Sequence, residues 1–532
     1  MASQGPTTSD HPTALLTAPP TTTRWARLVI APNQAAYKWW VAITVTLSAF
    51  LVVMNNATVN VALPQMMTTF GLNLDEAQWV ITAYMIAGAT LVPTVGWLGS
   101  RFGNRTVFLV SLGVFVISSG LCGLAWNGPS LVFFRVLQGL GGGPITPMAM
   151  VFLISAFPPH QRGLAMGLYG MGMSFGPAVG PVLGGYVTEY LNWRMVFFMN
   201  VLPGVLCVAL VFLVIPKVQE IVRRSLDVAG LSTLVVFLVS LLVALSQGHR
   251  EGWDAPYIQR LFVMAGLAFV AFVTIELRRQ EPLVELRLYK NFAFSMISVA
   301  VLLNSMCGWG SGFLQTILLQ RLLDYTPAQA GFVILPGALG MACTTLLAGR
   351  LTDKLDRRYV MLFGLVMFSV TSYWFSFLTL DQPMSWVLWM TVWRYISMGF
   401  LFTPMNTAAL ATLPPDKMRM GSGLITIVQQ GIGGTLSIAG LTTILQHRAA
   451  YHATMLDQQQ SLSLLGLGEL LAPVRDFVTR AGTIGAAVDA QALDALGQYL
   501  EQQATVAAYQ DCFLLLAALG VIMVPLVCFL RR

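Results

Sequence analysis

The stretch GWLGSRFGNR at residues 96–105 occurs a second time, in altered form, as GRLTDKLDRR at residues 349–358. Each copy ends a long apolar segment and opens a short basic loop before the next apolar segment begins. Because the copies lie about 250 residues apart, we expect the chain to contain two related halves. Two related helical bundles around a central site are typical of secondary transporters.

The composition around these loops indicates an all-α polytopic membrane protein. Of the 532 residues, 56% are hydrophobic and only 10% are charged, against roughly 25% charged residues in soluble domains. Continuous apolar runs of about 18 residues or more recur along the chain, and each can cross the bilayer as a helix. Barrel strands would alternate instead. We predict fourteen spans, at about residues 39–62, 77–98, 106–126, 130–154, 163–187, 195–215, 228–246, 259–279, 293–319, 328–350, 359–379, 384–411, 420–446 and 507–530.

The placement of the basic residues predicts the orientation of the chain. With the N-terminus inside, the inner segments hold 21 of the 30 Lys and Arg residues, and the outer segments hold 6. This asymmetry follows the positive-inside rule and puts both termini in the cytoplasm. The net charge of +7 therefore reflects topology and does not indicate nucleic-acid binding.

The repeated loop also divides the chain into segments. It follows the second span and again the tenth, which aligns spans 1–6 with spans 9–14 and leaves two inserted spans. Arg135 in span 4 and Arg394 in span 12 support this alignment, because a Pro-Pro loop with basic residues follows each span. We therefore predict a disordered cytoplasmic tail (1–38), an N-terminal six-helix bundle (39–216), a linker with two extra transmembrane helices (217–292) and a C-terminal six-helix bundle (293–532) with a long external loop (447–506).

No cofactor, metal site or enzyme active site is expected. The six cysteines lie in or at the spans without metal-ligand spacing, and the five histidines lie in loops or the tail. We find no phosphate-binding loop and no convincing nucleophile–base set.

Five motifs, in order and on the expected spans, carry a resemblance to a known family. They are NNATVNVALP at 55–64, the loop at 96–105, RVLQGLGG at 135–142, GPAVGPVLGG at 176–185 and WRMVFFMN at 193–200. The chain resembles the major facilitator superfamily and, within it, the fourteen-span drug:proton antiporters of the EmrB/QacA type. The resemblance covers nearly all of residues 38–530.

The resemblance implies export of hydrophobic small molecules or drugs across the bacterial cytoplasmic (inner) membrane. Such a protein works by alternating access, and inward proton movement drives export. A periplasmic membrane-fusion adaptor is a further implied partner, and the segment 447–506 is where it would dock. Leu and Ala recur with polar residues at helical spacing in Leu462–Leu471 and Ala487–Leu500, so a short external helical pair without a partner is the alternative for that segment.

Span 5 carries a stripe of glycines every four residues, which lets another backbone approach closely. Two prolines beside the stripe distort the helix locally. We expect this face to form a close contact between the bundles that seals the transport path, with simple close packing as the alternative. The residues are Gly172, Gly176, Gly180 and Gly184, with Pro177 and Pro181.

The repeated loops are candidates for a conformational switch. An acid at their fifth position can cap the N-terminus of a neighbouring helix and pair with a basic residue, which would hold the cytoplasmic side closed. Asp353 fills that position in the second copy, but Ser100 fills it in the first, so we expect a weaker first latch. The candidate switch residues of the two loops are Gly96, Arg101, Gly103, Arg105, Gly349, Asp353 and Arg357.

The candidate proton-coupling residues differ from the family pattern in the first span. The resemblance assigns Arg135 to proton transfer, whereas an Arg on an outward-facing side of the helix could also snorkel to the surface. The family pattern expects an aspartate where this chain has Asn55, and an amide cannot ionise. Predicted spans 1–6 contain no acidic residue in their interiors. The remaining candidates are Asp511, then Asp227 and Glu276, and a solvated helix-end carboxylate is the alternative for each.

Polar and aromatic residues at mid-membrane depth are the candidates for substrate binding. A cavity lined by them without a carboxylate would favour neutral or anionic lipophilic compounds over cations. The candidates are Asn55, Asn60, Gln138, Asn304, Trp309, Gln315, Asn406, Gln429 and Gln430.

Two other functions are compatible with the sequence. The same fold could export one specific metabolite or siderophore. The missing acids at Asn55 and Ser100 also leave room for a membrane sensor or scaffold that does not transport.

Overall fold

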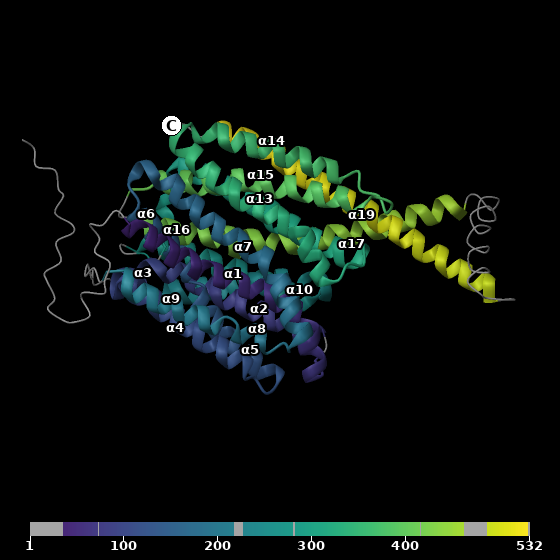
Figure 1. The fold of residues 1–532 in the computed structure, drawn as a ribbon, viewed down its shortest axis with the longest axis horizontal. Coiled ribbons are helices and arrows are strands. Elements are labelled where there is room, and N and C mark those ends of the chain that lie inside the picture. Colours follow the sequence, from purple (N-terminus) through teal and green to yellow (C-terminus); the bar gives the residue numbers. More distant parts are fainter. Residues whose placement is uncertain are drawn as a thin grey trace, which may run out of the picture.

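The computed structural model describes residues 36–72, 74–216, 227–279, 282, 284–414, 417–461 and 487–529. The regular elements in these ranges are helices, and they pack side by side with their long axes roughly aligned (Figure 1). Nearly all of the predicted tail (1–38) and residues 217–226 of the predicted linker lie outside the described ranges.

The first half forms a bundle in which three of the six spans are broken into shorter helices. In Figure 1 its purple and blue helices lie below the green helices of the second half. Its elements are α1 (Tyr37–Phe70), α2 (Leu74–Leu91), η2 (Val92–Thr94), α3 (Val95–Phe102), α4 (Asn104–Gly123), α5 (Gly128–Gly142), α6 (Ile145–Ala156), η3 (Pro159–Gln161), α7 (Arg162–Tyr190), α8 (Met195–Phe198) and α9 (Val201–Val214).

Two inserted helices precede the second bundle, α10 (Val228–Glu251) and α11 (Pro256–Arg278). The second bundle contains η4 (Leu286–Lys290), α12 (Phe292–Ile317), η5 (Leu318–Leu322), α13 (Pro327–Lys354), α14 (Arg357–Phe375), α15 (Met384–Ala411), α16 (Met418–Thr426), η7 (Ile427–Gly433), α17 (Gly434–Ser461) and α19 (Ala487–Cys528). Two of these segments, η5 and η7, are π-helical.

The described helices account for all fourteen predicted spans. Twelve helical stretches are long and apolar enough to cross a membrane. The other two spans are α7 and α15, which have 29 and 28 residues. Helix α7 is rich in glycine and α15 carries Arg394, so both have lower hydropathy than their neighbours. Both helices lie where the two bundles meet, because α7 packs on α13 and α15.

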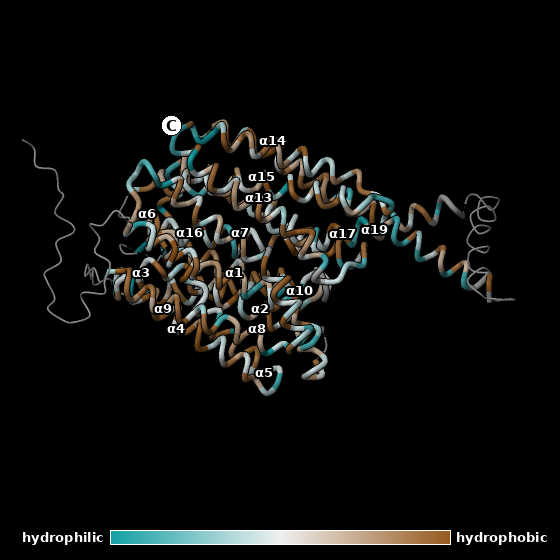
Figure 2. The backbone as a smooth tube through the Cα atoms, viewed as in Figure 1, coloured by the Kyte–Doolittle hydropathy of each residue, from teal (hydrophilic) through white to brown (hydrophobic). Residues whose placement is uncertain are grey.

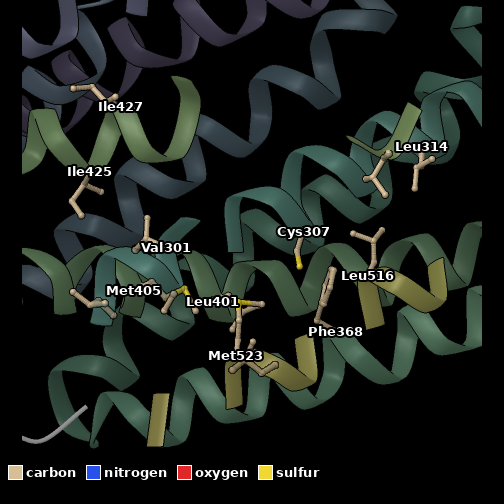
Figure 3. Packing of buried hydrophobic residues seen from close by; sticks show 14 of the residues in the cluster. Val301, Cys307, Leu314, Phe368, Leu401, Met405, Ile425, Ile427, Leu516 and Met523 are labelled. Atoms are coloured by element: carbon tan, nitrogen blue, oxygen red, sulfur yellow. The ribbon is translucent and has the colours of Figure 1, made fainter. Parts of the chain in front are cut away.

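The second bundle is held by an apolar core between its helices. Figure 3 shows Cys307 and Leu314 of α12 facing Phe368 of α14 and Leu516 of α19. Burial of such side chains stabilises helix packing through close van der Waals contact, since lipid is as apolar as the core. Side chains of α12, α14, α15 and α19 all contribute to this core, which therefore fixes how these four helices pack.

The segment predicted as a long external loop is helical wherever the structure describes it. Residues 447–461 continue α17 and residues 487–506 belong to α19, so both helices run beyond the bundles (Figure 1). Hydrophilic stretches gather along these projecting parts (Figure 2), and Ala492 and Leu496 on α19 form a small buried cluster. The helix expected at Ala487–Leu500 is part of α19, and residues 447–461 are helical because no Pro interrupts the extension of α17. The helix predicted at Leu462–Leu471 lies outside the described residues.

Helices α2 and α5 approach each other through glycines. A Cβ on Gly139 would lie 2.3 Å from the Tyr84 carbonyl oxygen, and a Cβ on Gly143 would lie 2.4 Å from that of Gly88. No side chain larger than hydrogen fits without moving backbone. The RVLQGLGG motif therefore sets the distance at which Arg135 meets α2.

We predict that Gly139→Ala destabilises the protein by about 1–3 kcal/mol, because the added methyl group must push α2 and α5 apart. Gly113→Ala is the matched control, since a Cβ at Gly113 meets nothing within 4 Å. Thermal unfolding of both variants in detergent, followed by tryptophan fluorescence, measures the difference. Equal melting temperatures would contradict the close packing of α2 on α5.

Candidate functional site

A buried polar network occupies the interior of the first bundle. Arg135 on α5 is fully buried; its Nε donates to the Val80 carbonyl at 2.8 Å and its Nη1 to Gln138 Oε1 at 2.6 Å. The guanidinium also lies 4.2 Å from the centre of the Tyr84 ring. These contacts compensate part of the cost of a charge at this depth. Arg135 therefore points into the bundle and does not snorkel outward.

Asn55 joins this network at the position where the family pattern has an aspartate. Its Oδ1 accepts from Gln138 Nε2 at 3.3 Å and from Asn200 Nδ2 at 3.2 Å, and Gln138 Nε2 also donates to Ser119 Oγ at 3.0 Å. The network thus joins α1, α4, α5 and the start of α9 with neutral groups around one cation. Asn200 and Ser119 were not among the predicted residues. Asn200 lies in the quoted WRMVFFMN motif, so a signal was present.

A second buried arginine lies in the second bundle. Arg394 on α15 is fully buried, and its Nη2 donates to Gln315 Oε1, while Gln315 Nε2 donates to Thr391 Oγ1. Its guanidinium lies 4.8 Å from the centre of the Phe375 ring and 5.4 Å from that of Phe513. Both bundles therefore hold an arginine bonded to a glutamine, at corresponding spans.

The other candidate substrate residues divide into one pair and several separate side chains. Gln429, in the π-helical segment η7, donates through Nε2 to Asn406 Oδ1 at 3.1 Å, and η7 packs against α2 of the first bundle. Asn304 and Gln430 are half-buried. Asn60 and Trp309 are exposed on the sides of their helices. The nine candidates therefore differ in burial and fall into separate hydrogen-bonded groups among the described residues.

The acid of the second repeated loop caps a helix of the other bundle. Asp353, in the last turn of α13, accepts from the backbone N–H of Gly163 through Oδ1 at 2.8 Å and from that of Leu164 through Oδ2 at 3.0 Å. Both donors belong to the first turn of α7, where a carboxylate is favoured by the unpaired N–H groups and the helix dipole. A Cβ on Gly349 would lie 2.3 Å from the Gly163 carbonyl oxygen. The two bundles therefore meet backbone to backbone at this end.

The first repeated loop makes a weaker version of the same contact. Gly96 packs on Met420 of α16, but Ser100 Oγ donates to the Trp97 carbonyl of its own helix at 2.8 Å. The N-cap residue of α16 makes no side-chain capping hydrogen bond. Gly103 turns the chain into α4 with φ 83°, a conformation that favours glycine.

The three candidate arginines of the repeated loops lie apart from the Asp353 cap. Arg105 Nη2 donates to the Phe212 carbonyl at 2.7 Å, Arg101 is exposed in the last turn of α3, and Arg357 begins α14. Among the described residues, no hydrogen bond or ion pair joins any of these three arginines to Asp353.

The glycine stripe of α7 packs within its own bundle, which corrects the expectation that it joins the two bundles. A Cβ on Gly176, Gly180 or Gly184 would meet Val53, Ala57 or Thr58 of α1 at 2.5–3.0 Å, and Pro177 lies beside this contact. The four-residue spacing of the glycines identifies one face of α7, but it does not identify the helix that packs against that face. A different set of glycines, Gly163, Gly167 and Gly170, faces α13 and α15.

Asp511 lies in an ionic cluster between α17 and α19. Its Oδ2 accepts from Arg448 Nε at 2.6 Å and lies 2.7 Å from His452 Nε2. His452 had been assigned to a loop, and its proximity to Asp511 was not foreseen. The other two candidate acids lie on the inserted helices. Asp227, the N-cap residue of α10, accepts from the Gly230 N–H at 2.9 Å and lies 3.4 Å from Arg279 Nε. Glu276 on α11 accepts from the Val284 N–H at 3.4 Å.

We predict that Asp353→Ala opens the end of the bundles that carries the repeated loops. Loss of the cap removes about 1–2 kcal/mol from the contact of α13 with α7. Double electron–electron resonance between spin labels at His160→Cys and Lys354→Cys should then show longer distances. Ser100→Asp places a carboxylate near the start of α16 and should shift the same distances shorter. An unchanged distribution in Asp353→Ala would exclude the cap as a latch.

Comparison with known proteins agrees with this arrangement. Residues 45–438 match the family model of the Major Facilitator Superfamily. The chain is 30% identical to the multidrug export protein EmrB of Escherichia coli over 433 residues, covering 80% of this chain and 84% of EmrB. It is 28% identical to the fatty acid resistance protein FarB of Neisseria gonorrhoeae over 93% of this chain and 96% of FarB. The crystal structure of the human organic anion transporter MFSD10 shares the fold, with a TM-score of 0.60 at 12% identity over 92% of this chain and 99% of that one. The chain therefore belongs to the major facilitator superfamily.

Proposed function

We propose that the protein exports lipophilic small molecules from the bacterial cytoplasm by alternating access. The observation that carries this proposal is the Asp353 cap, in which a carboxylate of one bundle binds two backbone N–H groups of the other. Such a contact can break and reform as the bundles rock about a central site. The similarity to EmrB, a multidrug export protein, and to FarB, a fatty acid resistance protein, supports export of lipophilic compounds.

Helices α7 and α13 form the junction that must open. They run antiparallel, with Gly163 beside Gly349 at one end and Val182 2.8 Å from a Cβ on Gly331 at the other. The positive-inside pattern assigns the Asp353 end to the cytoplasm, together with both termini. In this orientation the loops 96–105 and 349–358 form the cytoplasmic gate, and release at that end would expose the site inward.

Proton coupling, which the family resemblance implies, requires a group that binds and releases a proton. Asn55 cannot do so, and Arg135 is surrounded by neutral partners. Asp511 is the acid that this proposal retains, because His452 and Arg448 contact it between two transmembrane helices of the second bundle. Proton movement would then be linked to the relative positions of α17 and α19.

The projecting parts of α17 and α19 are the proposed docking element for a periplasmic adaptor. They extend as a helical pair on the side opposite to the repeated loops (Figure 1). Tyr451 and Met455 on α17 and Leu493 and Tyr499 on α19 are exposed along them. Amphipathic helices with exposed apolar side chains are suited to coiled-coil contacts with a partner.

Transport in proteoliposomes tests the function and the proton site together. A panel of lipophilic compounds is offered with and without an imposed pH gradient. Wild type should export members of the panel, and Asp511→Asn should lose most of the stimulation by the gradient because the amide cannot titrate. Asp381→Asn, in an exposed loop, is the matched control. Full gradient-driven export by Asp511→Asn would exclude this carboxylate, and absence of any export by wild type would exclude the function.

Site-specific photocrosslinking tests the adaptor. A photoreactive residue at Tyr499 should capture an envelope protein in intact cells, whereas one at lipid-facing Val263 on α11 should not. Equal products from both positions, or none from Tyr499, would contradict docking on the projecting helices.

A further inference from the structure

A surface groove follows one side of α11. It runs from Pro256 to Ala271, Val236 of α10 forms part of its wall, and its volume is about 680 Å³. Leu267 is exposed along it, whereas the small side chain of Ala268 is buried beneath it. Helix α11 is the least buried of the twelve strongly apolar spans. This α11 groove therefore faces the lipid and not the interior of a bundle.

One end of the α11 groove carries a cation. Gln259 and Arg260 are the polar side chains of its lining, and both are exposed near Pro256. Arg260 Nε donates to the Pro256 carbonyl at 3.0 Å, which holds the guanidinium beside the groove. In the part of the chain that the structure describes, Arg260 forms no ion pair. Its two terminal nitrogens are therefore available to an anion.

The length of the groove matches one leaflet of a bilayer. The helical rise from Arg260 to Ala271 is about 16 Å, and half of the hydrocarbon core is about 15 Å thick. Arg278, in the last turn of α11, lies about 27 Å from Arg260 along the helix, close to the whole core thickness. Arg260 thus lies at headgroup level, with the apolar groove at the depth of the acyl chains. In the orientation that the positive-inside pattern assigns, this is the periplasmic leaflet.

A second surface groove lacks the cation. It lies on α14 and α15, has a volume of about 330 Å³, and includes Val366. The residues that line it are apolar or aromatic apart from Thr371, and none of them is charged. Both grooves can receive an acyl chain from the bilayer, but only the α11 groove has a positive charge where the headgroup lies.

We propose that the α11 groove binds a phospholipid with a net negative headgroup from the periplasmic leaflet. The phosphate accepts hydrogen bonds from the terminal nitrogens of Arg260, and an acyl chain lies along Leu267 and Ala271. A zwitterionic phospholipid offers the same chain and phosphate, but its cationic group weakens the attraction to Arg260.

The bound lipid would contact a helix pair that touches both bundles. Ser246 Oγ of α10 lies 3.4 Å from Thr82 Oγ1 of α2, and Trp253 Nε1 donates to Thr443 Oγ1 of α17 at 3.2 Å. Helix α11 packs on α10 along its length. A lipid in the groove therefore supports the element that connects the first bundle with the second.

Photocrosslinking in nanodiscs that contain equal amounts of phosphatidylglycerol and phosphatidylcholine with identical acyl chains tests this proposal. A photoreactive residue at Met264, one turn from Arg260 in the α11 groove, reports its occupant, and one at Val366 reports the second groove. Mass spectrometry identifies the captured lipids. We expect phosphatidylglycerol to exceed phosphatidylcholine about five-fold at Met264, the effect of one arginine near the lipid surface, and the two lipids to be captured equally at Val366.

Arg260→Gln should abolish the enrichment at Met264, and Arg260→Lys should retain most of it because the charge remains. Arg278→Gln is the matched control, since it removes the same charge from the opposite end of α11 and should leave the enrichment unchanged. Three results would overturn the proposal: equal capture of the two lipids at Met264, the same enrichment in Arg260→Gln as in wild type, or the same enrichment at Val366, which would show a general preference of the surface. A crosslinked protein dimer from Met264 in place of lipid would assign the groove to a second copy of the chain and would also overturn it.

Discussion

The arrangement of the two bundles depends on the backbone contact of α7 with α13. At Gly163 and Gly349 each helix presents hydrogen where other residues carry a side chain, so the carbonyl of one lies against the Cα of the other. This spacing brings the N–H groups of the α7 first turn within reach of Asp353. Small residues and a cap therefore act together, because the cap would be out of range if either helix carried a larger side chain here.

Helix α7 uses its two faces for different purposes. One face packs on α1 through Gly176, Gly180 and Gly184 and belongs to a permanent contact inside the first bundle. The other meets α13 and α15 of the second bundle. A rearrangement of the bundles must keep the first contact and change the second. The interior of each bundle is consistent with this division, since Arg135 and Arg394 are bonded to residues of their own bundle.

Much of the fold could be predicted from the sequence, because hydropathy reports span length and the repeated loop reports symmetry. The capping role of Asp353 could be predicted because an acid in a short loop lies close to few helix N-termini. Sequence does not report which way a side chain points around a helix, so it could not show that Asn55 and Gln138 meet inside the first bundle while Asn60 and Trp309 are exposed. The burial of Arg394 could have been anticipated from its alignment with the buried Arg135 across the repeat. His452 was misplaced because a polar segment was taken for a loop.

The length of α19 has a mechanical consequence. Its 42 residues form one helix of about 63 Å, roughly twice the thickness of the hydrocarbon core. The half outside the membrane is thus a lever about 30 Å long, with the Asp511 cluster near its fulcrum. A rotation of the second bundle by a tenth of a radian would move the tip of this lever by about 3 Å. The rocking of a bundle inside the membrane is therefore transmitted, as displacement, to whatever is attached outside it.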